Sequence, residues 1–77
     1  MKIVIIGAGF SGSQLAKTLI AEGNKVVLVD KSAERVRSAG DQLDCTVIEA
    51  DGSNLEVLDK AGIASADALV TITGAHL

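Results

Sequence analysis

The 77-residue sequence has no proline, tryptophan or tyrosine, and it has one cysteine, one histidine and one phenylalanine. A lone cysteine excludes an internal disulfide and an all-cysteine metal site, so we expect Cys45 to be a small buried or half-buried residue. His76 has no further ligands at metal spacing, and no metal site is expected. Because proline is absent, glycine is left to separate the helices and strands.

Long apolar runs are also missing, although 48% of the residues are hydrophobic and the mean hydropathy is +0.40. No run approaches the ~18 residues that span a bilayer, and the N-terminus has no signal-peptide pattern. We therefore expect a cytoplasmic protein that is not inserted into a membrane. The net charge is −3 and the few basic residues are scattered, which argues against nucleic-acid binding. The basic cluster at 31–37 is interpreted as the solvated face of a helix.

Short apolar runs alternate with segments of helical spacing along the chain. Strands are predicted over 2–7, 25–30, 44–51 and 67–73. Helices are predicted over 11–23, 31–43 and 53–62, the first with an apolar stripe made of Leu15, Leu19 and Ile20.

Helix ends are marked by capping residues. Ser32 is the predicted N-cap of the second helix, and Ser53 with Glu56 has the spacing of a capping box on the third. Gly23 and Gly62 are predicted to end the first and third helices. The inner face of the second helix is predicted to hold Ala33, Val36 and Ala39.

This alternation predicts an α/β fold with a parallel sheet, in the order βαβαβαβ. The first two strands are almost continuously apolar, which is typical of strands covered on both faces. Right-handed crossovers then give the strand order 3-2-1-4, a Rossmann-like arrangement that is half of a doubly wound domain. Residues 1–77 are predicted to form one nucleotide-binding domain, or the N-terminal part of a larger one. The last strand would be an uncharged open edge, so we expect further chain or a second copy to cover it.

The motif Gly7-x-Gly9-x-x-Gly12 lies between the first strand and the first helix. In a dinucleotide-binding loop the first glycine makes the tight turn, the second allows a diphosphate to approach, and the third allows close helix packing. The amides of Phe10 and Ser11 would then face the phosphates at the positive end of the helix dipole. A turn that binds no ligand is the alternative.

Asp30 ends the second strand, close to the ~20-residue distance at which such folds place a ribose-binding acid. Its carboxylate would accept a bond from a ribose 2′-hydroxyl and repel a 2′-phosphate, which favours NAD or NADH over NADP(H). Lys31 could partly neutralise such a phosphate. A solvated acid that starts a turn is the alternative for Asp30.

Other candidates lie at the same edge of the sheet. Asp51 is predicted either to accept from an adenine amino group or to cap the next helix. Thr73 and Gly74 either line the ribose and diphosphate side of the crevice or form an ordinary strand end. Phe10 is expected to cover the diphosphate, to contact a partner chain, or to pack in the core.

Two stretches of the chain match a known pattern: residues 2–30, and residues 47–74 with the segments VIEADGSNLEVLDKAG and ADALVTITG. They resemble the N-terminal nucleotide-binding domain of Trk/Ktr potassium-uptake regulators, the RCK, KTN or TrkA-N family. The resemblance covers almost the whole chain. It implies a cytoplasmic regulatory subunit, not an enzyme, that binds NAD(H) or the adenine nucleotides ADP and ATP. It also implies a homodimer or higher oligomer that controls a membrane potassium transporter subunit at the inner face of the membrane.

Carried across by position, the resemblance implies phosphate contacts at Gly7, Ala8, Gly9, Phe10 and Ser11, and a ribose contact at Asp30. It also implies an adenine-side contact at Asp51 and rim contacts at Thr73 and Gly74. Gly12 and Lys31 complete the set of expected cofactor-binding residues. Many family members carry Arg or Gln where this chain has Phe10, so a specific contact with the terminal phosphate of ATP is not expected. The cofactor half of an NAD-dependent dehydrogenase, and a scaffold without ligand, are the alternatives.

Overall fold

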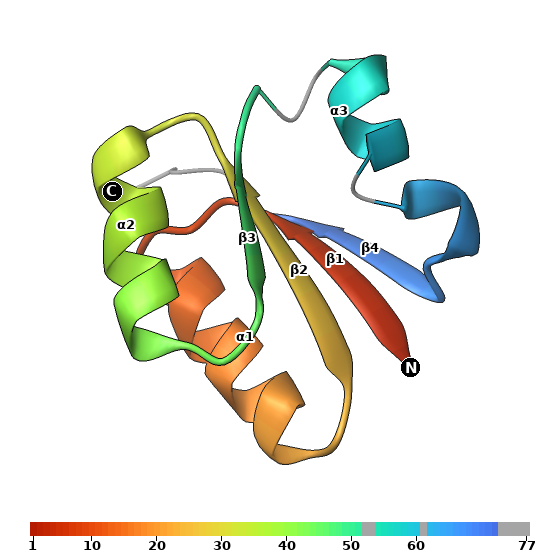
Figure 1. Cartoon of the computed structure of the whole chain (residues 1–77). Coiled ribbons are helices and arrows are strands. Elements are labelled where there is room, and N and C mark those ends of the chain that lie inside the picture. The colour runs from red at the N-terminus through yellow and green to blue at the C-terminus, as the bar shows by residue number, and fades with distance from the viewer. Residues whose placement is uncertain (52–53, 61, 73–77) are drawn as a thin grey trace.

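The computed structural model describes residues 1–51, 54–60 and 62–72. Within these ranges the elements are β1 (Lys2–Ile6), α1 (Phe10–Ala21), β2 (Lys25–Asp30), α2 (Ala33–Gln42), β3 (Thr46–Glu49), α3 (Leu55–Lys60), a 3-10 turn (Ile63–Ser65) and β4 (Ala68–Thr71). The strands form one parallel sheet in the order β3-β2-β1-β4 (Figure 1). The predicted α/β class and strand order are confirmed.

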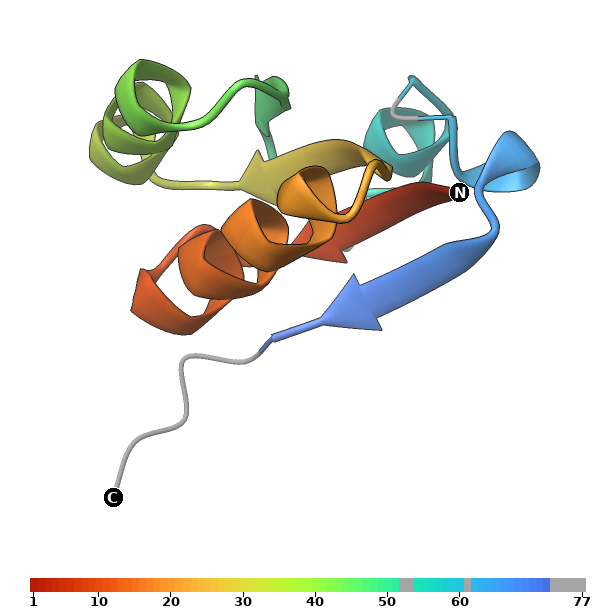
Figure 2. The same ribbon diagram turned by 90° about the horizontal axis from the view of Figure 1, so that it is seen from below.

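Both faces of the two central strands are buried, as their continuous apolar runs predict. Ile3 and Ile5 pack with Ala16 of α1 and Ala39 of α2. Val4 points to the opposite face, where it packs with valines of β2. In Figures 1 and 2, α1 and α2 lie together to one side of the strands and α3 lies to the other. The core therefore consists of two thin apolar layers separated by the sheet.

The end of α1 follows the glycine prediction. Gly23 has a φ of 90°, the left-handed region that glycine adopts without strain. Its N–H donates to the Ile20 carbonyl at 3.0 Å, and the Asn24 N–H donates to the Leu19 carbonyl at 3.0 Å. These two bonds form a Schellman motif that satisfies the last carbonyls of the helix.

Helix α2 begins where its capping residue predicts. The Ser32 hydroxyl accepts a hydrogen bond from the Arg35 N–H at 3.3 Å. Ala39 is buried and Val36 is half-buried, as expected for the inner face. The prediction for Ala33 is wrong: it is exposed, because it is the first residue of the helix and precedes the turns that contact the sheet.

Helix α3 is shorter than predicted. Ser53 lies outside the described residues, and Asn54 provides a cap by accepting from the Glu56 N–H at 2.9 Å. Gly62 has a φ of 81° and separates α3 from a 3-10 turn over Ile63–Ser65, which the sequence pattern did not reveal. The helix therefore ends before Gly62, as expected.

Two further expectations are confirmed. Strand β4 is an edge of the sheet, and Leu69 on it is 46% exposed. Cys45 is half-buried against the face covered by α1 and α2. Burial, and then the neighbouring Asp44 carboxylate, raise the pKa of the Cys45 thiol.

Gly23 and Gly40 offer a matched pair of substitutions, because a Cβ at either position would meet nothing within 4 Å. Only Gly23 has a positive φ. We expect Gly23→Ala to lower the free energy of unfolding by about 1 kcal/mol through backbone strain. Gly40→Ala should raise it by about 0.5–1 kcal/mol, because alanine favours the helix interior. Urea denaturation measures both, and equal effects at the two positions would contradict the assignment of Gly23 as a left-handed cap.

Candidate functional site

The glycine loop follows β1 at the carboxyl end of the sheet. Gly7 has a φ of 120°, and its N–H donates to the Val29 carbonyl at 2.7 Å, so the turn starts while the chain is still bonded to β2. A Cβ on Gly7 would lie 2.5 Å from the Ile72 carbonyl oxygen. A Cβ on Gly12 would overlap the Gly7 carbonyl oxygen. Both glycines are therefore required by the fold, in the roles predicted for them.

Gly9 differs from its two neighbours in the motif. It is the N-cap of α1 with a φ of −70°, which any residue can adopt. A Cβ there would meet nothing closer than the Arg35 guanidinium at 3.9 Å, an ordinary contact distance. The packing of the chain therefore gives no reason for a glycine at position 9.

The start of α1 presents backbone donors to this loop. The first bond of the helix runs from the Ser13 N–H to the Gly9 carbonyl at 2.9 Å, so the amides of residues 10–12 precede the helical ladder. No side chain caps this end of the helix. Uncapped amides at a helix N-terminus, together with the helix dipole, favour an anion.

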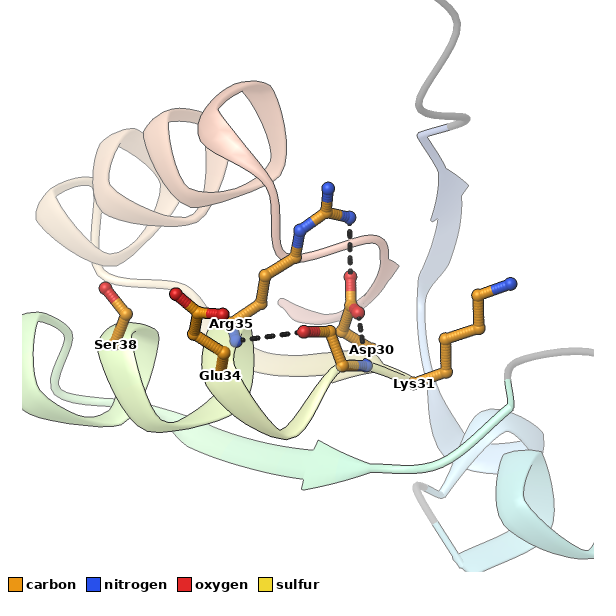
Figure 3. A pocket seen from close by; sticks show the side chains of 6 residues that line it. Asp30, Lys31, Glu34, Arg35 and Ser38 are labelled. Carbon is orange, nitrogen blue, oxygen red and sulfur yellow. Dashed lines mark hydrogen bonds and ion pairs between the residues drawn. The ribbon is translucent and has the colours of Figure 1, made fainter.

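Asp30 joins β2 to the glycine loop. Its carboxylate is buried, with 7% of the residue exposed, and Oδ2 accepts from the Ala8 N–H at 2.7 Å. Oδ1 accepts from the Ser32 N–H at 2.8 Å. Arg35 lies beside the same carboxylate, with Nη1 3.8 Å from Oδ2 (Figure 3). The predicted acid is therefore in direct contact with the predicted phosphate loop.

The environment of Asp30 favours its charged form. Burial, the largest single influence, raises the pKa of the carboxyl, but it is outweighed by the hydrogen bonds from Ala8 and Ser32 and by the positive charges of Arg35 and Lys31. The pKa of Asp30 consequently lies below its ordinary value of 3.8. The site thus holds a carboxylate that stays ionised at neutral pH and that can accept hydrogen bonds only.

An open depression of about 580 Å³ lies beside Asp30, at the corner between β2 and α2. It is lined by Asp30, Lys31, Ser32, Glu34, Arg35 and Ser38. Arg35 was missed as a site residue, because residues 31–37 were interpreted as a solvated helix face. The signal that could have identified it is its place in the first turn of α2, directly after the corner that carries Asp30.

The remaining predicted site residues that the structure describes are all exposed. Phe10 is 82% exposed at the start of α1, so core packing is excluded for it. Ser11 and Lys31 are exposed. Asp51 is exposed after β3, and its carbonyl accepts from the Asn54 N–H at 3.0 Å. The last two candidates, at positions 73 and 74, lie outside the described residues.

No three Asp, Glu, Cys or His side chains in the described part of the chain lie close enough together to hold a metal ion. Over the same residues, no helix has the length and apolar character that crossing a bilayer requires.

A parallel sheet ordered 3-2-1-4, a glycine loop opening the first helix and a buried acid at the tip of the second strand define a Rossmann-like nucleotide-binding domain. The sequence profile of the TrkA-N domain matches residues 3–76. The chain belongs to the TrkA-N domain family, which confirms the resemblance noted in the sequence.

Similar proteins carry the name Trk system potassium uptake protein TrkA. The chain is 42% identical to that of Vibrio alginolyticus over 73 residues, which is 95% of this chain and 16% of that protein. It is 47% identical over 74 residues to homolog 1 of Methanosarcina mazei, covering 96% of this chain and 18% of that protein. A homolog from Pyrococcus abyssi is 38% identical over 74 residues, 96% of this chain and 33% of that protein. The chain thus spans a third or less of the length of these relatives.

Replacing Asp30 tests whether its charge holds the corner together. A depressed pKa means that ionised Asp30 stabilises the fold above pH 3.8 and that this stabilisation is lost as the pH falls through the folded-state pKa. Asp30→Asn should lower the free energy of unfolding at pH 7 by about 1–3 kcal/mol, because an amide cannot accept bonds on both of its heavy atoms. The deficit relative to the unmodified protein should shrink in urea titrations below pH 3.8. A deficit that does not depend on pH would contradict this role.

Proposed function

We propose that this chain is the nucleotide-binding regulatory module of a Trk-type potassium uptake system, with NAD or NADH as its ligand. The observation that carries the proposal is the hydrogen bond from the Ala8 N–H to the Asp30 carboxylate at 2.7 Å, which joins the glycine loop to the acid for which we propose ribose binding. Similar proteins named Trk system potassium uptake protein TrkA supply the biological setting.

The residues present fit a dinucleotide. A diphosphate would lie against the amides at the start of α1, where Gly9 offers no Cβ and the helix dipole is favourable. The two oxygens of Asp30 each accept one backbone hydrogen bond, and each keeps a second lone pair for a ribose hydroxyl. Asp51 is proposed on the adenine side, and Thr73 and Gly74 at the rim of the site.

The regulatory step requires that the nucleotide bind two arrangements of the protein with different affinities. We propose that the nucleotide changes how paired copies of this domain are arranged in a homodimer or higher oligomer. A membrane potassium transporter subunit would respond to that change at the cytoplasmic face. Phe10, exposed beside the loop, is positioned to touch either the ligand or a neighbouring copy. ADP and ATP are the alternative ligands, since they share the adenosine and diphosphate groups that the site fits.

The cofactor half of an NAD-dependent dehydrogenase is the second candidate, because it would use the same glycine loop and acid. Hydride transfer also needs an acid–base residue at the nicotinamide. Asp30, the buried acid at this corner, is ionised and bonded to two backbone amides, which suits sugar binding. Steady oxidation of NADH in the presence of candidate carbonyl substrates would favour the dehydrogenase, whereas binding without turnover favours the regulator.

Gly9→Ala separates ligand binding from folding. Because a Cβ at position 9 meets only ordinary contacts, the free energy of unfolding should fall by less than about 1 kcal/mol. NADH should nevertheless bind at least about tenfold more weakly, since the Cβ would hold the diphosphate away from the amides. NADH fluorescence titration and urea denaturation give the two values.

Gly12→Ala serves as the contrast, because its Cβ would overlap backbone atoms and should destabilise the fold by several kcal/mol. If Gly9→Ala bound NADH as tightly as the unmodified protein, the proposed diphosphate position would be wrong.

Asp30 should also set the choice between dinucleotides. We expect NADH to bind about tenfold more tightly than NADPH, because a 2′-phosphate is repelled by the carboxylate and removes the ribose hydroxyl that it binds. Asp30→Ala should narrow the ratio of the two dissociation constants to about threefold or less, measured by calorimetry. Equal affinities in the unmodified protein, or a ratio unchanged in the variant, would contradict the assignment. If the protein bound neither dinucleotide nor ADP at millimolar concentration, the result would support the alternative of a scaffold without ligand.

A further inference from the structure

Arg35 occupies a position between the two halves of the proposed site. Its Nη1 lies 3.8 Å from Asp30 Oδ2, and its guanidinium lies 3.9 Å from the place where a Cβ on Gly9 would be. Oδ2 is also the oxygen that accepts from the Ala8 N–H. The guanidinium therefore lies over the side of the carboxylate that faces the glycine loop.

The contact between Arg35 and Asp30 is a loose ion pair. Its 3.8 Å separation is longer than a hydrogen bond, and 58% of the arginine side chain is exposed. Such pairs add little to stability, and Asp30 is already held by two backbone N–H groups. Arg35 is thus not needed to position the acid. Its five guanidinium donors, which make no hydrogen bond among the described residues, remain available for an anion.

Neighbouring charged residues do not share this position. Figure 3 shows the Lys31 side chain extending away from the carboxylate and the Glu34 side chain turned toward Ser38. Of the three other charged residues that line the depression, only Arg35 reaches over Asp30. One negative and one positive charge therefore lie side by side on the lining of the depression.

We propose that Arg35 sets how strongly the site discriminates against a phosphate on the ribose 2′ oxygen. The inference rests on the proposed function, because it takes Asp30 as the ribose-binding residue. Asp30 repels a 2′-phosphate, whereas the planar guanidinium of Arg35 can donate two bonds to it. Arg35 therefore lessens the preference for NADH and allows 2′-phosphorylated dinucleotides to bind as weaker ligands.

The test compares Arg35→Gln with Arg37→Gln by calorimetric titration with NADH and NADPH. Arg37 is on the same helix and exposed but does not line the depression, so it controls for the loss of one positive charge. Arg35→Gln should raise the ratio of the NADPH to NADH dissociation constants about five- to tenfold, the effect of one charge-assisted bond at a partly exposed site. In Arg37→Gln the same ratio should stay within about twofold of its value in the unmodified protein, because a charge outside the depression acts on the ligand only through screened long-range effects.

A third variant ensures that a loss of folding is not mistaken for a change in specificity. Arg35→Lys keeps the charge and should give a ratio between those of the unmodified protein and Arg35→Gln. An unchanged ratio in Arg35→Gln, or an equal rise in Arg37→Gln, would overturn the inference while leaving the proposed function intact. If the unmodified protein bound neither dinucleotide at millimolar concentration, the proposed function would fail and this inference with it.

Discussion

The hydrogen bond between the Ala8 N–H and the Asp30 carboxylate is the contact on which the geometry of the site depends. A buried carboxylate is unfavourable unless it is paired or hydrogen-bonded, and here a backbone amide on each side meets that requirement. The bond fixes the end of β2 against the turn that follows β1. Because the donors belong to the main chain, only replacement of Ala8 or Ser32 by proline would remove them. The spacing between the acid and the start of α1 is consequently a property of the backbone.

The pattern of residues was sufficient to predict most of the fold. Continuous apolar runs separated by helical segments leave few arrangements, because parallel strands require crossovers and the crossovers have one hand. Gly7, Gly12 and Gly23 could be assigned in advance, since each sits where a side chain would clash or where the chain turns left-handed. Ser32 could be assigned as a cap because its interaction spans only three residues.

What the pattern did not reveal depends on distances across the folded chain. Arg35 looked like a solvated helix residue, because its approach to Asp30 follows from the angle at which α2 leaves β2. The exposure of Ala33 has the same origin, since the first turn of α2 stands away from the sheet. Phe10 could be assigned to no single environment from sequence, because one aromatic side chain carries no periodicity. The 3-10 turn at 63–65 is too short to leave a periodic signal.

The three glycines of the loop are under different constraints. A side chain at position 7 or 12 would clash with neighbouring backbone atoms, whereas a side chain Cβ at position 9 would meet only ordinary contacts. If the loop binds a diphosphate, natural selection for folding preserves the outer two glycines, and only selection for binding preserves the middle one. A residue other than glycine at position 9 would therefore identify relatives that keep this fold but no longer bind the ligand.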